Sequence, residues 1–235
     1  QQVHDRISLE VLRGCTQGCR FCQAGMTTRP VRERTIEGIE TLMDRTLEAP
    51  GYEEVSLVSL STCDYSTPRQ MVDKVVRRAA PERIGVSLPS LRLDSFSVEL
   101  ADMVAGIRRT GLTFAPEAAS PRLRAVINKW IPDEDLLNMA TEAYKRGWDH
   151  VKLYFMIGLP GETDVDVLGI AKTCQMLQEK CRDLGPLSLN LTISNFTPKP
   201  HTPFQWHSVS KSELERLQIL LKEKFKKLKG IKCNF

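Results

Sequence analysis

HVKLYFMIGLPGET, residues 150–163, decides the fold class of this 235-residue chain. The apolar run at 150–157 predicts a strand, and the turn with glycine and proline that follows ends it. Beyond the turn, apolar residues recur at spacings of three and four, which is typical of an amphipathic helix that packs on a sheet. The residues of this predicted apolar stripe are Leu168, Ala171, Cys174, Leu177, Cys181 and Leu184. The stretch therefore reads as one strand–turn–helix unit.

The same unit recurs along the chain on both sides of this stretch. The other predicted strands are ISLEVL at 7–12, EVSLVSL at 54–60, IGVSL at 84–88, LTFAPE at 112–117 and LSLNLTIS at 187–194, and IKCNF at 231–235 could begin a seventh. A last helix is expected from about 212 to 228. Six such units in one unbroken run, without a linker rich in serine or proline, predict an α/β fold. We expect one domain over 1–235, a partial parallel (β/α)6 barrel, open and TIM-like rather than closed with eight strands.

The unusual segments of the sequence all follow predicted strands. They are GCTQGCRFC at 14–22, SLSTCDY at 59–65, PEAAS at 116–120, GLPGET at 158–163 and NFTPKPHTPF at 195–204. In parallel α/β folds the functional groups lie on the loops at the carboxyl ends of the strands. The five segments are therefore expected on one rim.

Three of the seven cysteines, Cys15, Cys19 and Cys22, fall within eight residues. Thiolates select zinc or an iron–sulfur cluster. A structural zinc site needs four ligands, and no fourth Cys or His lies nearby in the sequence, whereas a four-iron cluster held by three thiolates keeps one iron open. Three unrelated thiols, or zinc completed by a distant residue, are the alternatives. The distant ligands considered are His201, His207 and Cys63.

The CxxxCxxC spacing, with the aromatic Phe21 just before the last cysteine, resembles the signature of the radical SAM superfamily. The resemblance implies that Cys15, Cys19 and Cys22 bind a 4Fe-4S cluster and that S-adenosylmethionine (SAM) chelates the open iron. It also implies reductive cleavage of SAM to a 5′-deoxyadenosyl radical, which abstracts a hydrogen atom from an unknown substrate. A flavodoxin- or ferredoxin-like reductant is the implied partner.

The resemblance implies roles for residues that would hold the methionine part of SAM. Ser61 and Thr62 lie where the family usually has a Gly-Gly-Glu-like segment that binds the amino group. The glycines and the glutamate are absent, so hydroxyls or backbone carbonyls would do this work here. For the methionine carboxylate the candidates are Arg122 and Lys129, and Arg92 is another.

The resemblance also implies residues for the ribose and the adenine. Glu117 resembles the acidic residue that accepts hydrogen bonds from the ribose hydroxyls, since its two oxygens can each accept one. Gly158 and Gly161 would let the backbone approach the adenine closely. Asn195 and Phe196 resemble the last segment that contacts adenine.

Within the superfamily, the segments SLSTCDYS, SLPSLRLD, FAPEAASPRLRAVINK and NFTPKPHTPFQW most resemble uncharacterised enzymes that carry a cobalamin-binding domain. That domain would precede Gln1, so we expect the chain to be the core of a longer protein, with cobalamin as a cofactor of the whole. Methylthiotransferases share the PEAAS-like and NFTPKP-like segments, so methyl transfer, methylthio transfer and other oxidoreductase chemistry all stay open. The alternative from another class is a non-catalytic iron–sulfur or zinc-binding scaffold module.

Composition restricts the partners and the location. Hydrophobic residues make up 41% and charged residues 26%, which excludes a disordered or collagen-like chain. The net charge of +4 is too slight to predict nucleic-acid binding, although RNA is the alternative reading of the Lys-rich tail at 222–232. No membrane partner is expected, because the longest strongly apolar stretch, 153–160, is far shorter than a membrane helix. The odd cysteine count and the lack of a visible targeting signal favour the cytoplasm.

Overall fold

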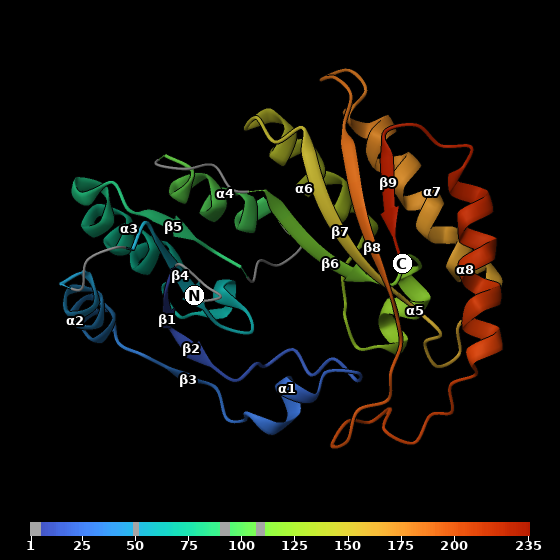
Figure 1. The fold of residues 1–235 in the computed structure, drawn as a ribbon, viewed down its shortest axis with the longest axis horizontal. Coiled ribbons are helices and arrows are strands. Elements are labelled where there is room, and N and C mark those ends of the chain that lie inside the picture. The colour runs from blue at the N-terminus through green and yellow to red at the C-terminus, as the bar shows by residue number, and fades with distance from the viewer. Residues whose placement is uncertain (1–5, 49–51, 90–94, 107–110) are drawn as a thin grey trace. The chain divides into compact units, whose positions relative to one another are not determined.

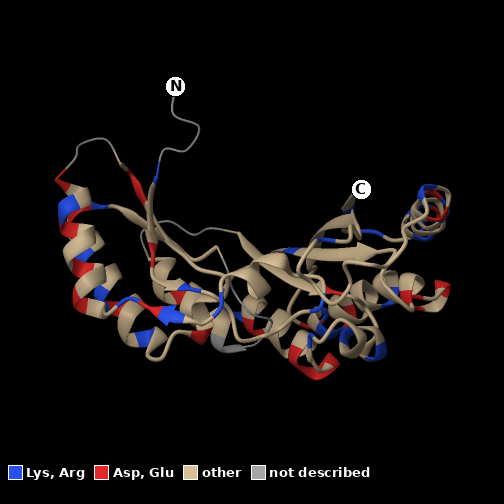
Figure 2. Cartoon of the chain, turned by 90° about the horizontal axis from the view of Figure 1, so that it is seen from below, with Lys and Arg blue, Asp and Glu red and all other residues tan. Residues whose placement is uncertain are grey.

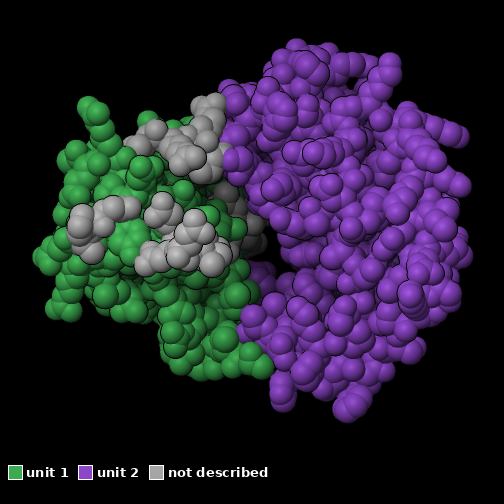
Figure 3. Space-filling model, in the orientation of Figure 1, with its two compact units in different colours: residues 1–16, 27–92, 96–110 green, residues 17–26, 93–95, 111–235 purple. Residues whose placement is uncertain are grey.

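The computed structural model describes residues 6–48, 52–89, 95–106 and 111–235. The chain divides into two compact units, which Figure 3 shows in different colours. Unit 1 comprises residues 1–16, 27–92 and 96–110, and unit 2 comprises residues 17–26, 93–95 and 111–235. None of the described helices is long and apolar enough to cross a membrane.

Unit 1 contains a parallel three-stranded sheet in the order β1–β4–β5, together with a short antiparallel pair, β2–β3 (Figure 1). The strands are β1 (Ile7–Glu10), β2 (Leu12–Arg13), β3 (Arg32–Glu33), β4 (Glu54–Val58) and β5 (Gly85–Ser87). The helices are α2 (Ile36–Leu47), α3 (Pro68–Ala79) and α4 (Ser95–Val104), with 3-10 turns at Thr62–Asp64 and Ala80–Glu82.

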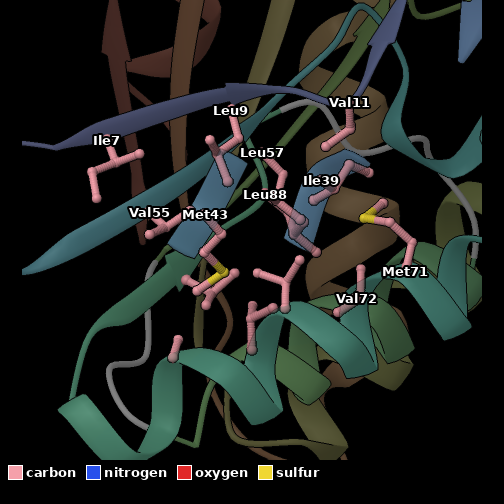
Figure 4. Close-up of a cluster of buried hydrophobic side chains, with 14 of the residues drawn as sticks. Ile7, Leu9, Val11, Ile39, Met43, Val55, Leu57, Met71, Val72 and Leu88 are labelled. Carbon is pink, nitrogen blue, oxygen red and sulfur yellow. The ribbon is translucent and has the colours of Figure 1, made fainter. Parts of the chain in front are cut away.

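The core of unit 1 forms where α2 and α3 cover the strands (Figure 4). α2 starts at its N-cap Thr35, whose hydroxyl accepts a hydrogen bond from the Gly38 amide at 3.1 Å. α3 starts with Pro68 in its first turn and buries residues at helical spacing. The two helices and the sheet bury Ile7, Leu9, Ile39, Met43, Val55, Leu57, Met71, Val72 and Val75.

Unit 2 contains a parallel four-stranded sheet in the order β6–β7–β8–β9 (Figure 1). The strands are β6 (Leu112–Glu117), β7 (His150–Ile157), β8 (Ser188–Asn195) and β9 (Ile231–Asn234). The helices are α5 (Pro121–Val126), α6 (Asp133–Lys145), α7 (Asp164–Cys181) and α8 (Lys211–Phe225), and the short α1 (Gln23–Thr27) follows the clustered cysteines. α7 packs between α6 and α8. Its buried residues include Cys174 and Cys181, as the apolar stripe predicts.

Basic and acidic residues are interspersed along the helices of both units (Figure 2). In unit 1, for example, Arg78 of α3 forms ion pairs with Asp44 of α2 and with Glu82, both at 2.6 Å. In unit 2, Arg216 of α8 pairs with Asp164 of α7 at 2.6 Å. Exposed pairs of this kind contribute only about 0–1 kcal/mol each.

The prediction of an α/β fold with parallel sheets is confirmed, and none of the described strands closes a barrel. β6 and β7 have the predicted bounds, and the tail forms β9, parallel to β8. The first predicted strand divides, because the amide of Val11 donates to Val58 of β4 while its carbonyl accepts from Arg34 beyond β3, both at 3.0 Å. The last helix ends at Phe225 rather than 228.

Candidate functional site

The carboxyl ends of three parallel strands meet at one edge of the unit 2 sheet. The register pairs Glu117 of β6 with Phe155 of β7, and Ile157 of β7 with Asn195 of β8. Gly158 follows Ile157 directly. The structure therefore brings the predicted residues Glu117, Gly158 and Asn195 to the same edge.

Glu117 ends β6 in an unusual backbone conformation. Its φ is 67°, in the left-handed region that non-glycine residues seldom adopt, and the register with β7 shifts between Phe114 and Glu117. Its Oε1 lies 3.3 Å from Nζ of Lys129, and the two side chains are only 15% and 23% exposed. Burial raises the pKa of Glu117, and the Lys129 ammonium opposes this. Backbone strain of this kind concentrates at functional sites, and it falls here on a residue predicted to bind the ribose.

Arg122, the other basic candidate on this segment, has a different environment. Its guanidinium forms an ion pair with the buried Asp166 of α7 and donates to the Gly161 carbonyl at 2.9 Å. Asp166 also accepts hydrogen bonds from Ser120, the N-cap of α5, and from the Thr163 amide and hydroxyl. One carboxylate thus joins the starts of α5 and α7, and Arg122 belongs to that junction. Of the two candidates, Lys129 is the one that lies beside Glu117.

Arg124 is a buried cation that sequence reasoning missed. Its side chain is 1% exposed, donates to the carbonyls of Ala119 at 2.6 Å and Ile131 at 2.8 Å, and pairs with Asp133 at the start of α6. These contacts hold α5 and the turn after it against α6.

Glu162, in the turn after β7, was also missed. Its Oε2 accepts a hydrogen bond from the Gly158 amide at 2.6 Å, which closes the turn. Burial raises its pKa to about 7, and the carboxylates of Asp166 and Asp164 act in the same direction against the backbone hydrogen bonds. Gly158 itself has a φ of 84°, and a Cβ there would lie 2.5 Å from the Leu214 side chain. Only glycine fits this position without a shift.

The stability of Glu162→Gln relative to wild type should be greater at pH 8 than at pH 5. The folded pKa near 7 lies above the ordinary value of 4.5, so stability from the neutral carboxyl is present below about pH 4.5 and is lost as the pH rises through 7. A loss of about 2–3 kcal/mol is expected in wild type, and the amide, which keeps an acceptor for Gly158, removes it. Urea unfolding of both proteins between pH 4.5 and 8 measures the difference. Parallel profiles would contradict the burial of this charge.

The clustered cysteines are divided between the two units. Cys15 belongs to unit 1, and Cys19 and Cys22 belong to unit 2. All three are partly exposed thiols. The Cys22 amide donates to the Cys19 carbonyl at 3.0 Å, and the Gly25 amide donates to Cys22 Sγ at 3.3 Å.

No three His, Cys, Asp or Glu side chains within the described ranges are arranged to hold a metal ion. The ligand set of Cys15, Cys19 and Cys22 therefore stays a prediction from the spacing. Of the distant zinc ligands, His201 and His207 are exposed, and Cys63 Sγ lies 3.0 Å from Ser97 Oγ in unit 1.

The predicted aromatic contacts, Phe21 and Phe196, share one apolar cluster in unit 2. Phe196 is buried, and its ring meets Phe204 edge-on at 6.0 Å between centroids. Phe21 packs against the cluster and is partly exposed. The exposed Asn195 accepts a hydrogen bond from Gln218 at 3.1 Å.

The remaining predicted residues belong to unit 1. Ser61 and Thr62 follow β4 and are buried. Thr62 Oγ1 lies 2.8 Å from Ser59 Oγ, whereas Ser61 Oγ has no hydrogen-bond partner among the described residues. An unsatisfied buried hydroxyl is suited to accept a hydrogen bond from a ligand amino group. Arg92 lies outside the described residues.

The comparisons with known proteins identify the family. The Radical SAM superfamily matches residues 9–174. The chain belongs to this superfamily. Its members use a 4Fe-4S cluster and SAM.

This radical SAM chain is similar to two curated proteins and to a solved structure. An uncharacterized protein of Methanocaldococcus jannaschii is 30% identical over 97% of the chain and 48% of its own length. A tRNA-2-methylthio-N(6)-dimethylallyladenosine synthase of Solibacter usitatus is 24% identical over 93% of the chain and 49% of its own length. The chain thus spans about half the length of these curated relatives.

The third is a solved structure, the radical SAM methyltransferase TsrM from Kitasatospora setae, with cobalamin and a 4Fe-4S cluster bound. It matches with a TM-score of 0.64 and 17% identity, over 85% of this chain and 36% of that one. The likeness shows the fold, which in these neighbours is a TIM-like partial barrel.

Proposed function

We propose that this radical SAM domain is catalytic, that Cys15, Cys19 and Cys22 hold a 4Fe-4S cluster, and that SAM binds at the carboxyl ends of the strands. The observation that carries the proposal is the half-buried Glu117–Lys129 pair at that edge of unit 2. The cluster, when bound, supplies the electron that cleaves SAM reductively and so generates a 5′-deoxyadenosyl radical. The donor set fits, because soft thiolates are the usual ligands of such clusters.

The Glu117–Lys129 pair suits two parts of SAM. The Glu117 carboxylate accepts hydrogen bonds from the two ribose hydroxyls, and the Lys129 ammonium binds the methionine carboxylate. Because Lys129 and Glu117 already lie 3.3 Å apart, one ligand can contact both. The left-handed backbone at Glu117 fixes the direction in which its carboxylate points.

The other predicted residues complete the proposed SAM site. Gly158 and Gly161, both with positive φ, allow the turn after β7 to approach the adenine. Phe196, with Asn195 before it, supplies the apolar neighbourhood of the ring. Ser61 and Thr62, in unit 1, stay the residues that the resemblance implies for the methionine amino group, and the Ser61 hydroxyl has no hydrogen-bond partner among the described residues. Arg92 stays the alternative to Lys129 for the carboxylate. Phe21, directly before Cys22 in the sequence, is proposed as a further contact of the cofactor.

Anaerobic reconstitution with iron and sulfide, followed by reduction in the presence of SAM, tests the proposal. The expected results are about four irons per chain and the formation of 5′-deoxyadenosine. A cluster that forms but never cleaves SAM would favour the scaffold alternative. One tightly bound zinc in place of iron would overturn the proposal.

Lys129→Met should weaken SAM binding by about tenfold to a hundredfold, since a hydrogen bond to a charged group contributes about 1.5–3 kcal/mol. Equilibrium dialysis of the reconstituted protein measures the Kd. Lys145→Met, which removes an exposed lysine paired with Glu142 on α6, is the matched control. If Arg122→Met raised the Kd for SAM and Lys129→Met left it unchanged, the assignment of the two basic residues would be reversed.

The chain spans about half the length of its curated relatives, so its substrate, partners and location are proposals for the whole protein. We propose a flavodoxin- or ferredoxin-like protein as the reductant and the cytoplasm as the location. Cobalamin is bound in TsrM, and we propose it as a cofactor of the full-length protein rather than of this chain alone. Absorbance of the purified full-length protein after incubation with hydroxocobalamin, compared with this chain, tests that point.

A further inference from the structure

We propose that Asn128 is a positioning residue that fastens the cysteine loop to the turn after α5, and so fixes Cys19 and Cys22 relative to Lys129. The inference rests on the proposed function and goes beyond it. All the groups involved belong to unit 2.

The side-chain amide of Asn128 binds the cysteine loop just before Cys19. Its Nδ2 donates to the carbonyl of Gln17 at 3.1 Å and to the carbonyl of Gly18 at 3.0 Å. The two carbonyls lie 111 and 110 residues away in the sequence. The side chain thus holds the backbone that leads directly into Cys19.

Trp130 determines how the Asn128 amide is oriented. Its Nε1 donates to Asn128 Oδ1 at 3.1 Å. The indole N–H is a donor only, so it selects the carbonyl side of the amide and leaves both N–H groups for the loop. Trp130 is 75% exposed, which is unusual for an indole. Its hydrogen bond gives this exposed residue a role in the site.

The backbone of Asn128 adds a second argument. Its φ is 57°, so this residue, like Glu117, adopts the left-handed region. Asparagine tolerates that region better than most residues, and the conformation aims its side chain at the loop. The adjacent Lys129 pairs with Glu117 at 3.3 Å. Asn128 therefore contacts the cysteine loop, and the next residue, Lys129, contacts Glu117, the residue proposed to bind the ribose.

Arg20, in the cysteine loop, also joins this loop to the end of α5 and the turn after it. Its amide donates to the Ile127 carbonyl at 2.9 Å, and its guanidinium donates to the Val126 carbonyl at 2.6 Å. Phe21 packs against the apolar cluster that contains Ile127. The turn after α5 thus contacts the loop on both sides of Cys19, through Asn128 at the Gly18 carbonyl before it and through the Arg20 amide after it.

Asn128→Asp is the sharpest test. Aspartate has the same shape, tolerates positive φ and keeps the acceptor for Trp130, but it cannot donate to the two carbonyls. Asn138→Asp, the same change at an exposed position of α6, is the control. Hydrogen exchange of the apo-protein should be about tenfold faster in the peptide 17–22 of Asn128→Asp and unchanged in β7 and β8. After reconstitution, a chelator should remove iron about tenfold faster than from Asn138→Asp.

Trp130→Phe should give a smaller change in the same peptide, because the amide loses the donor that orients it. Exchange in 17–22 equal to the control, or a rise spread evenly over unit 2, would overturn the positioning role. Should wild type bind no cluster, the proposed function fails, yet exchange in the apo-protein still decides the inference.

Discussion

The Cys19→Ala variant is expected to lose the 4Fe-4S cluster and to form 5′-deoxyadenosine at least about a hundredfold more slowly than wild type. Removing even an outer hydrogen-bond partner of a metal ligand costs about 10–100-fold in metal affinity or activity, and a ligand itself matters more. With two thiolates left, the cluster has two open irons in place of one. Iron and sulfide analysis and the yield of 5′-deoxyadenosine after reduction with SAM measure the two losses.

Cys233→Ser is the matched control for Cys19→Ala. Cys233 is a partly buried thiol of β9, and burial raises its pKa to about 11, so it is a poor ligand at neutral pH. The serine variant should keep the iron content of wild type. Full iron content in Cys19→Ala, or loss in Cys233→Ser, would contradict the assignment of Cys15, Cys19 and Cys22.

Most of the fold could be predicted because each strand–turn–helix unit is local. β7 has the predicted bounds since its apolar run ends at the glycine turn. The first strand was predicted too long because Val11 bonds to β4 on one side and to Arg34 on the other, pairings that no local pattern encodes. The apolar spacing of the last helix also continues into a turn, where the Leu228 amide donates to the Phe225 carbonyl.

The site was predicted less completely, because its hydrogen bonds join distant segments. Glu117 and Lys129 were predicted separately, and their pairing follows from the fold. Glu162 carried no signal, since a glutamate in a turn reads as exposed. Asp166 had one, because Thr163 three residues earlier forms a capping box with it. Asn128 had none, as its partners lie more than a hundred residues away.

α5 connects these segments within unit 2. Its N-terminal end is tied through Asp166 to the turn after β7, and its C-terminal turn is tied through Asn128 to the cysteine loop. Lys129, between Asn128 and Trp130, reaches Glu117 at the end of β6. A change at either end of this helix should therefore affect residues proposed for the cluster and for SAM together.

Asp166→Ala should destabilise the apo-protein by about 3 kcal/mol, equivalent to a fall of about 6–12 °C in Tm for a chain of this size. The variant leaves Ser120 and Thr163 without their acceptor and removes the capping box of α7. Burial pushes the pKa of Asp166 up, but the hydrogen bonds from Ser120, Thr163 and Arg122 outweigh it and lower the pKa. Its stabilisation is therefore present above the ordinary pKa of 3.8 and is lost as the pH falls below it.

Asp164→Ala is the control, since Asp164 lies two residues earlier on the same helix in an exposed pair with Arg216. This variant should cost less than about 1 kcal/mol. Urea unfolding at pH 7 compares the two variants, and repeating it at acidic pH should shrink the large deficit of Asp166→Ala. The hydrogen bond from Arg216 also lowers the pKa of Asp164, but the deficit of Asp164→Ala is small at both pH values. Equal losses for both, or a deficit of Asp166→Ala that does not change with pH, would contradict the view that one buried carboxylate holds the starts of α5 and α7 together. If the loss is as large as expected, SAM binding should weaken with it, because Asp166 contacts both Thr163, in the turn that includes Gly161, and Ser120, at the start of the helix whose following turn carries Lys129.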